Sequence, residues 1–188
     1  MKKSFSILIA GIVLVSLWSC SDSTTDPKAE PKAEPKVEQK AEPKAELKVD
    51  PKVKADLMAA GQQKYVVCVA CHGTDGKGMQ PAPGMVMAAS WVDSKILKKG
   101  SAEVIVAILM RGIKKVNPTE YMGQIMMPLG ASMPDADVAS IVTYVRNTFG
   151  GHDDIVTEAQ VKEWRAKYVS TAGPMERKAL EELAGVDK

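Results

Sequence analysis

The sequence contains little histidine and cysteine, and this scarcity argues against several kinds of metal protein. Among its 188 residues there are three cysteines and two histidines. A structural zinc site takes about four ligands of these types, and Cys20 lies far from the others, close to the N-terminus. The remaining strong candidates are Cys68, Cys71, His72 and His152. A further pair of cysteines is missing, so the composition does not favour a zinc site.

A charge excess of either sign is also missing. Lys and Arg number 25 against 23 Asp and Glu, which gives a formal net charge of +2. Lys2 and Lys3 belong to a segment that we expect to be removed, and without them each sign has 23 side chains. Because nucleic-acid-binding surfaces depend on a marked basic excess, this balance predicts no nucleic-acid partner.

The first twenty residues have the layout of an export signal. Two lysines precede an apolar run over residues 5–18, which is short for a helix that spans a bilayer. Cys20 follows, and Leu17 and Ser19 before it resemble the lipidation motif of bacterial lipoproteins. We therefore predict a signal peptide over residues 1–19, lipidation of Cys20 and a location on the periplasmic side of a bacterial membrane. An ordinary cleaved signal and an uncleaved anchor are the alternatives.

A degenerate Pro-Lys-Ala-Glu repeat follows, from Asp26 to Asp56. It holds eight lysines and eight acidic residues in alternation, and few apolar side chains that a core could bury. Frequent prolines keep such a chain extended. We expect residues 20–54 to form a disordered, flexible linker that tethers a folded domain to the membrane.

The segment VVCVACHGTDGKG, residues 66–78, carries the clearest chemical signal. Cys68 and Cys71 are three positions apart and His72 follows directly. Zinc, a redox disulfide and covalent haem all use closely spaced cysteines. A redox pair would lie between a strand and a helix, and no strand pattern flanks this one. The C-x-x-C-H order is the attachment pattern of c-type haem, in which both thiols bind vinyl groups and the histidine binds iron.

The sixth iron ligand decides whether such a haem only carries electrons or also binds small molecules. The segment YMGQIMMPLG offers Met126 and Met127. Pro128 favours an extended backbone at the residue before it, which suits a side chain that reaches to iron. Met127 is therefore our first choice and Met126 the second. Other candidates are Met122, Met133 and His152, although Met133 suits packing at the start of the next helix.

Hydrophobic periodicity predicts helices on both sides of this site, and no convincing alternating strand is present. One helix runs from about residue 55 into the cysteines, and another spans residues 101–112. In the first, Gly61 would allow a close helix neighbour, with Tyr144 or Val145 in contact. A third helix is marked by an apolar stripe of Val138, Ile141, Val142, Val145 and Phe149.

The tail, residues 152–188, is predicted to be a helical C-terminal extension. Thr157 and Gln160 have the spacing of a capping box. After them, Val161, Trp164 and Tyr168 could share one face of a helix that packs on the preceding domain. A short final helix is expected over about residues 175–183.

Residues 55–151 resemble a class I cytochrome c. The resemblance lies in the spacing of Gly61 and Tyr65 before CVACHG, in the Met127-Pro128 strap and in the closing DADVASIVTYVRNTFG. It implies an all-α fold of three to five helices around one covalent haem c. It also implies that Cys68 and Cys71 form the thioethers, that His72 is the proximal ligand and that Met127 is the distal ligand.

The resemblance further implies single-electron transfer between redox proteins, such as a membrane or periplasmic dehydrogenase and a terminal oxidase, without catalysis. The alternatives are an open-site haem enzyme or gas sensor, and a cytochrome subunit of a dehydrogenase or oxidase complex. One departure is MVMAASW, where related sequences often have Pro-Pro-Leu before SW. We expect a carbonyl within Pro81–Gly84 to accept from the second His72 nitrogen, Met87 to pack on the haem and Trp91 to lie at its edge.

Overall fold

The computed structural model describes residues 49–114, 126–171 and 173–186. Over these ranges the backbone forms helices and loops, and β-type pairing is limited to isolated bridges, as an all-α fold requires. The predicted signal peptide, Cys20, nearly all of the repeat and Met122 lie outside the described residues. Within the described part of the chain, no helix has the length and apolar character needed to cross a bilayer.

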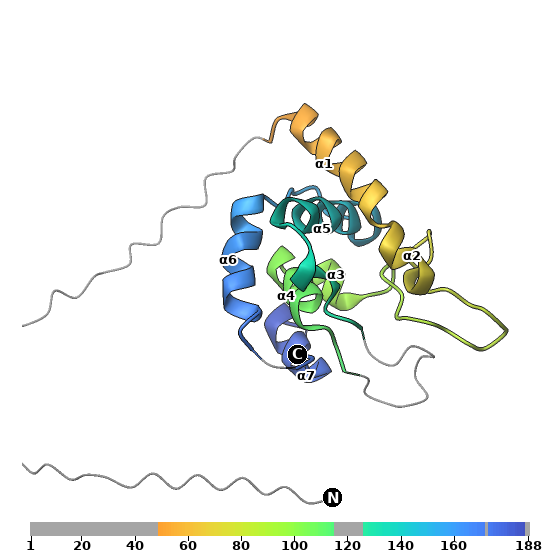
Figure 1. Cartoon of the computed structure of the whole chain (residues 1–188). Coiled ribbons are helices and arrows are strands. Elements are labelled where there is room, and N and C mark those ends of the chain that lie inside the picture. The colour runs from red at the N-terminus through yellow and green to blue at the C-terminus, as the bar shows by residue number, and fades with distance from the viewer. Residues whose placement is uncertain (1–48, 115–125, 172, 187–188) are drawn as a thin grey trace, which may run out of the picture. The chain divides into compact units, whose positions relative to one another are not determined.

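Two long helices, α1 (Pro51–Lys64) and α5 (Asp135–Gly150), cross and pack against each other (Figure 1). The first begins before the expected start at residue 55 because Pro51 suits the first turn and the Asp50 carboxylate accepts from the Lys52 amide at 2.8 Å. Gly61 is buried at the crossing, and the whole predicted stripe of α5 is buried. Tyr144 is the neighbour of Gly61 that the sequence predicted.

The first helix does not run unbroken into the cysteines, because Tyr65 separates α1 from α2 (Val66–His72). The Tyr65 ring lies 5.4 Å from that of Tyr144 and 5.5 Å from that of Phe149, centroid to centroid. Its hydroxyl donates to the Gly73 carbonyl at 3.1 Å. Tyr65 therefore fixes both ends of α2 relative to α5.

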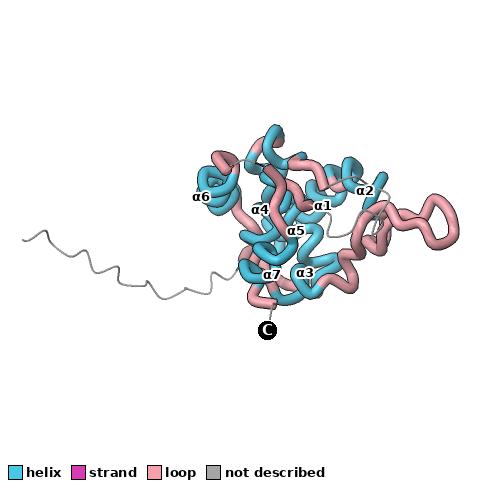
Figure 2. The backbone as a smooth tube through the Cα atoms, turned by 90° about the horizontal axis from the view of Figure 1, so that it is seen from below, coloured by secondary structure: helices cyan, strands magenta, loops and turns pink. Residues whose placement is uncertain are grey.

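The core is centred on α4 (Ala102–Arg111), in which every residue from Ala102 to Met110 except Glu103 is buried. Ser101 occupies its N-cap position, although the side chain makes no capping hydrogen bond. Before it lies the short α3 (Lys95–Lys99), and Figure 2 shows that residues 73–94, between α2 and α3, form a long loop. A short 3₁₀ helix, η1 (Leu129–Ser132), packs on α4.

The C-terminal extension folds onto the same core through α6 (Glu158–Tyr168) and α7 (Arg177–Ala184). The predicted capping box is present: Thr157 and Gln160 bond reciprocally at the start of α6. In Figure 1, α6 lies beside α4 and α5, while α7 packs on α3 and α4. Val161 and Leu180 are fully buried, so both helices contribute to the core.

A buried arginine fixes the turn between α5 and the extension. Arg146 is 4% exposed, and its guanidinium bonds Asp154 through two nitrogens, at 3.1 and 2.8 Å, and the Gly100 carbonyl at 2.9 Å. His152 Nδ1 lies 3.1 Å from the same group, and its Nε2 lies 2.7 Å from the Leu97 carbonyl oxygen. His152, a minor candidate for iron ligation, is thus engaged in this network.

Candidate functional site

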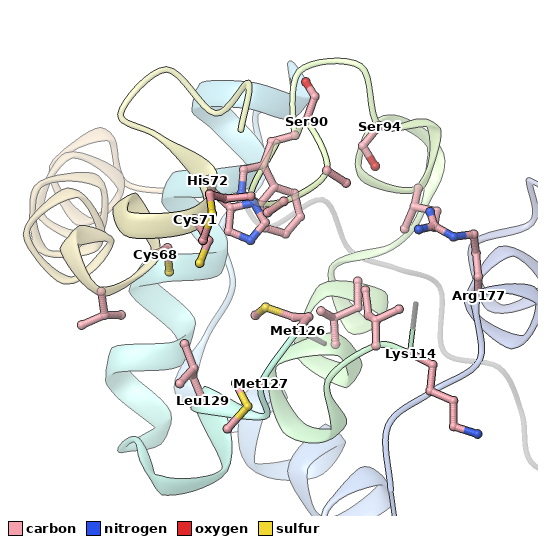
Figure 3. Close-up of a pocket in the computed structure, with 18 residues that line it drawn as sticks. Cys68, Cys71, His72, Ser90, Ser94, Lys114, Met126, Met127, Leu129 and Arg177 are labelled. Carbon is pink, nitrogen blue, oxygen red and sulfur yellow. The ribbon is translucent and has the colours of Figure 1, made fainter. Parts of the chain in front are cut away.

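The C-x-x-C-H segment forms α2 and faces a cavity (Figure 3). Cys68 and Cys71 lie one turn apart, and His72 is the last helical residue before Gly73. Cys68 and His72 are each 8% exposed. The space open to the centre of a water molecule is about 200 Å³, whereas a single water needs roughly 10–15 Å³. The cavity is therefore sized for a ligand far larger than water.

The cavity wall is mostly apolar and is assembled from segments far apart in the sequence. Before α5 it is formed by α2, residues 87–91, the start of α3, α4 and residues 126–129. After α5 it is formed by α7. Among its apolar lining residues are Val67, Met87, Ala88, Ile96, Ile108, Ile113 and Leu129. Such a surface suits a large flat apolar cofactor and keeps water from most of it.

His72 is held by a ring stack. Its imidazole lies 4.7 Å from the Trp91 ring, centroid to centroid, at an interplanar angle of 26°. Burial lowers the pKa of His72, and the backbone of Ala89 only partly opposes this, so the neutral imidazole is favoured. A neutral imidazole is the form that binds a metal ion. His72 Nδ1 has no hydrogen-bond partner, so the carbonyl expected from Pro81–Gly84 does not reach it.

Both cysteines are free thiols, and burial keeps Cys68 largely protonated. Burial, with a smaller contribution from Cys71, raises the pKa of Cys68 to about 11. A protonated thiol is a poor zinc ligand. Among the described residues, no group of three or more His, Cys, Asp or Glu side chains could hold a metal ion. These residues therefore give no support to the zinc alternative, and the two cysteines do not form a disulfide.

The arrangement fits a covalent haem. Cys68 and Cys71 supply the two thiols, and His72 supplies a buried neutral imidazole beside them. Thioether sulfurs of a methionine pair line the same cavity. Trp91 and His72 both line this cavity, and each has a buried ring nitrogen without a hydrogen-bond partner. When bound, a haem supplies the redox-active iron and two carboxylates that would need polar partners in the same wall.

The two candidate distal methionines differ in their surroundings. Met126 is half-buried, and its backbone pairs with Ile113 through hydrogen bonds of 3.1 and 3.2 Å. Met127 is 56% exposed. Figure 3 shows the Met126 side chain reaching into the cavity and the Met127 side chain beside Leu129 at its edge. Met133 and His152 are not among the residues that line the cavity.

The glycine-rich loop after the cysteines makes tight contacts with the rest of the protein. Gly78 has φ +91°, and a Cβ added there would lie 2.4 Å from the Ala88 carbonyl oxygen. The Gly78 amide also donates to the His72 carbonyl at 3.0 Å. This glycine therefore allows residues 86–88 to return to the cavity wall, which Met87 and Trp91 both line.

The structure adds four polar residues that the sequence did not single out as part of the site: Ser90, Ser94, Lys114 and Arg177. Ser94 also caps α3, because its hydroxyl accepts from the Leu97 amide at 3.1 Å. Arg177 comes from α7, more than one hundred residues beyond His72. No local pattern marks Arg177, because only the packing of α7 on α3 and α4 brings it to the cavity.

Comparison with known proteins agrees with this geometry. Residues 58–149 match the sequence model of the cytochrome c family. Cytochrome c-554(548) of Halomonas halodenitrificans is 30% identical over 88 residues, which cover 46% of this chain and 89% of that protein. Thiosulfate dehydrogenase of Stutzerimonas stutzeri is 28% identical over 119 residues, 62% of this chain. This chain spans only 35% of that enzyme's length.

The chain belongs to the cytochrome c family. The cofactor of this family is a covalently attached haem c, and the cysteine pair that such attachment requires, Cys68 and Cys71, lies at the cavity. The family supports a role in electron transfer at this haem.

Proposed function

We propose that this protein carries one electron at a time at a single haem c and that it does not turn over a substrate. One observation carries the proposal: the two thiols, the His72 imidazole and the Met126–Met127 pair all line one cavity with mostly apolar walls. Iron with an imidazole on one side and a thioether on the other is six-coordinate in both oxidation states. Neither state then needs to gain or lose a ligand.

In this proposal each residue has a separate task. Cys68 and Cys71 hold the cofactor covalently, and His72 is the proximal ligand, oriented by its stack on Trp91. Met127 is proposed as the distal ligand on the strength of Pro128, with Met126 the second choice. The apolar wall excludes water from the metal, and thioether ligation favours the reduced iron relative to a second imidazole.

Ligand binding by the purified protein tests the closed site. We expect ferrous protein to show no spectral change with carbon monoxide, and ferric protein to bind cyanide only slowly. Full reduction by one electron per haem, followed by reoxidation without loss of the spectrum, would support the carrier role. Ready binding of carbon monoxide by the wild-type ferrous protein would overturn it in favour of an open-site enzyme or sensor.

The similarity to a thiosulfate dehydrogenase supplies a second candidate, an enzyme that oxidises a small sulfur compound. It covers about a third of that enzyme's length, so it supports this activity less directly. The test is to mix ferric protein with thiosulfate and to follow haem reduction. Rapid reduction that saturates with thiosulfate would favour the enzyme, whereas slow linear reduction would favour the carrier.

We also propose that the protein is exported to the periplasmic side of a bacterial membrane and anchored there by a lipid on Cys20. The apolar residues 5–18 followed by Cys20 support this, and residues 20–54 would then act as the tether. Its partners would be redox proteins of that compartment, such as a dehydrogenase and a terminal oxidase. A Cys20→Ser variant should leave the membrane fraction and keep its haem spectrum. Unchanged partitioning would argue against the anchor.

A further inference from the structure

The helix α7 belongs to the extension, beyond residues 58–149 that match the family, yet its first residue lines the haem cavity. Arg177 is half-buried and reaches this wall together with Ser94 and Lys114. Figure 3 shows the Arg177 guanidinium directed toward the cavity on the side away from the two cysteine sulfurs. The extension therefore brings a cation to a cavity whose opposite side holds the attachment cysteines.

The positions of the vinyl and propionate groups on haem indicate what the Arg177 guanidinium would bind. The vinyl groups that react with cysteine occupy one part of the porphyrin edge, and two propionate carboxylates project from another part. A haem attached through Cys68 and Cys71 would therefore have its vinyl edge at α2, and its propionates would need polar partners elsewhere in the cavity wall. Carboxylates at the edge of an apolar cavity are costly unless charged or polar groups meet them. Arg177 is placed to be such a group.

We propose that Arg177 binds a haem propionate, so that the C-terminal extension completes the cofactor site. The guanidinium is planar and can donate two parallel hydrogen bonds to one carboxylate, which suits it better than a lysine for this task. Ser94 lies on the same wall and offers a hydroxyl donor, while its oxygen accepts the capping hydrogen bond from the Leu97 amide. The proposal rests on haem attachment and is independent of whether the protein is a carrier or an enzyme.

Lys114 lines the same cavity but is less suited to be the main partner. Its ammonium lies 2.5 Å from Glu176 Oε1, and its side chain is 51% exposed. This is a surface ion pair, and an ammonium lacks the two parallel donors that a guanidinium offers to one carboxylate. Arg177 follows Glu176 directly, so this ion pair also helps to hold the start of α7 against residues 112–114.

Two backbone hydrogen bonds fix the chain just before α7. The Met175 amide donates to the Gly112 carbonyl at 3.0 Å, and the Lys114 amide donates to the Met175 carbonyl at 2.9 Å. Met175 is 5% exposed, and Leu180 on the first turns of α7 is fully buried. Arg177 is thus anchored on both sides by buried residues, so its position is set by the core and not by a loose tail.

The test compares the midpoint potential of Arg177→Gln with that of Lys178→Gln over a range of pH. Lys178 is the next residue of α7, its side chain is 85% exposed, and its variant makes the same change in net charge. Loss of Arg177 should lower the potential, because an unpaired propionate stabilises the ferric haem. It should also raise the propionate pKa into the range in which ordinary carboxylic acids titrate, about pH 4–6, where the potential then falls with rising pH.

We expect a flat profile in this range for the wild type and for Lys178→Gln, and a sloping, lower profile for Arg177→Gln. Equal profiles for the two variants would overturn the proposal. Redox-difference infrared spectra give a second readout: the propionate carboxylate bands should shift in Arg177→Lys, which keeps the charge and loses the planar donor. Unshifted bands would count against the proposal even if Arg177→Gln did not fold. Absence of covalent haem in the wild type would instead refute the haem assignment itself.

Discussion

Arg165 of α6 and Asp135 at the start of α5 form an ion pair, with Arg165 Nε 2.5 Å from Asp135 Oδ1. The same guanidinium donates to the carbonyls of Gly130, Ala131 and Met133 at 3.0, 3.0 and 2.7 Å. Both side chains are about four-fifths buried, with exposed fractions of 20% and 19%. One residue of the extension therefore holds the backbone between the methionine pair and α5.

We predict that Arg165→Gln weakens the ligation of iron by the distal methionine. Three carbonyls and a carboxylate lose their donor, which should lower the free energy of unfolding by roughly 2–3 kcal/mol. The thioether-to-iron charge-transfer band of the ferric protein should weaken at a lower temperature than in the wild type. This band reports ligation, so its early loss separates a positioning role from a general loss of stability.

Lys162→Gln is the matched control, because Lys162 is exposed on the same helix and loses the same charge. Arg165→Lys should recover only part of the effect, since an ammonium cannot reach the same set of acceptors. If the band of Arg165→Gln disappears only together with the helical circular dichroism signal, Arg165 acts on global stability alone.

The identity of the distal ligand is decided by single substitutions in the methionine pair. We expect Met127→Ala to lose the charge-transfer band, to bind carbon monoxide in the ferrous state and to have a lower potential, because a thioether favours reduced iron. Met126→Ala should keep the band. The reverse outcome would place the ligand one residue earlier, in keeping with the half-buried Met126 side chain at the cavity. Retention of the band in both variants would exclude each as the sole ligand.

The crossing of α1 and α5 depends on Gly61. A Cβ added there would lie 2.1 Å from the Ser140 carbonyl oxygen and 2.6 Å from Tyr144 Cβ. Since the nearest atom is backbone, the helices must move apart, and we predict that Gly61→Ala lowers the free energy of unfolding by roughly 2–4 kcal/mol. Thermal or denaturant unfolding measures this. Gln62→Ala, at an exposed position of the same helix, should change it by less than about 0.5 kcal/mol.

The contact between α4 and α6 should depend on pH through Glu103. Its carboxylate accepts hydrogen bonds from Lys167 Nζ and Tyr168 Oη, each at 2.6 Å. Burial alone would raise the pKa of Glu103, but these two hydrogen bonds and the positive charge of Lys167 together outweigh burial and hold the pKa below its ordinary value. A depressed pKa stabilises the fold above the pKa of the unfolded chain, and this contribution is lost as the pH falls through the folded-state pKa.

Glu103→Gln should therefore lower the free energy of unfolding by roughly 1 kcal/mol near pH 7. The difference from the wild type should shrink as the pH falls through the lowered folded-state pKa of Glu103. Denaturant unfolding at several pH values measures this. Glu163→Gln, exposed on α6, serves as the control and should show no comparable loss at pH 7. A difference that persists unchanged at acid pH would show that the charge of Glu103 is not what stabilises the contact.

Local sequence was sufficient for the features that depend on neighbouring residues. The C-x-x-C-H spacing predicted the haem attachment segment, the apolar stripe predicted α5, and the Thr157–Gln160 spacing predicted the cap of α6. Gly61 indicated a close helix crossing because the absence of a side chain has few other uses inside a helix. Each of these signals lies within a few turns of chain, and a periodic pattern or a fixed spacing is enough to reveal it.

The contacts around the cavity became apparent only from the tertiary structure. The stack of Trp91 on His72, the four acceptors of Arg165 and the arrival of Arg177 at the cavity join residues that are far apart in the chain or lie beyond the family's region. No local pattern specifies them. The stack depends on how the loop at residues 73–94 returns to α2, and the contacts of Arg165 and Arg177 depend on where buried residues such as Val161 and Leu180 dock α6 and α7 on the core. The sequence by itself indicated the attachment chemistry and most of the helices, whereas packing determined which charged side chains reach the cavity.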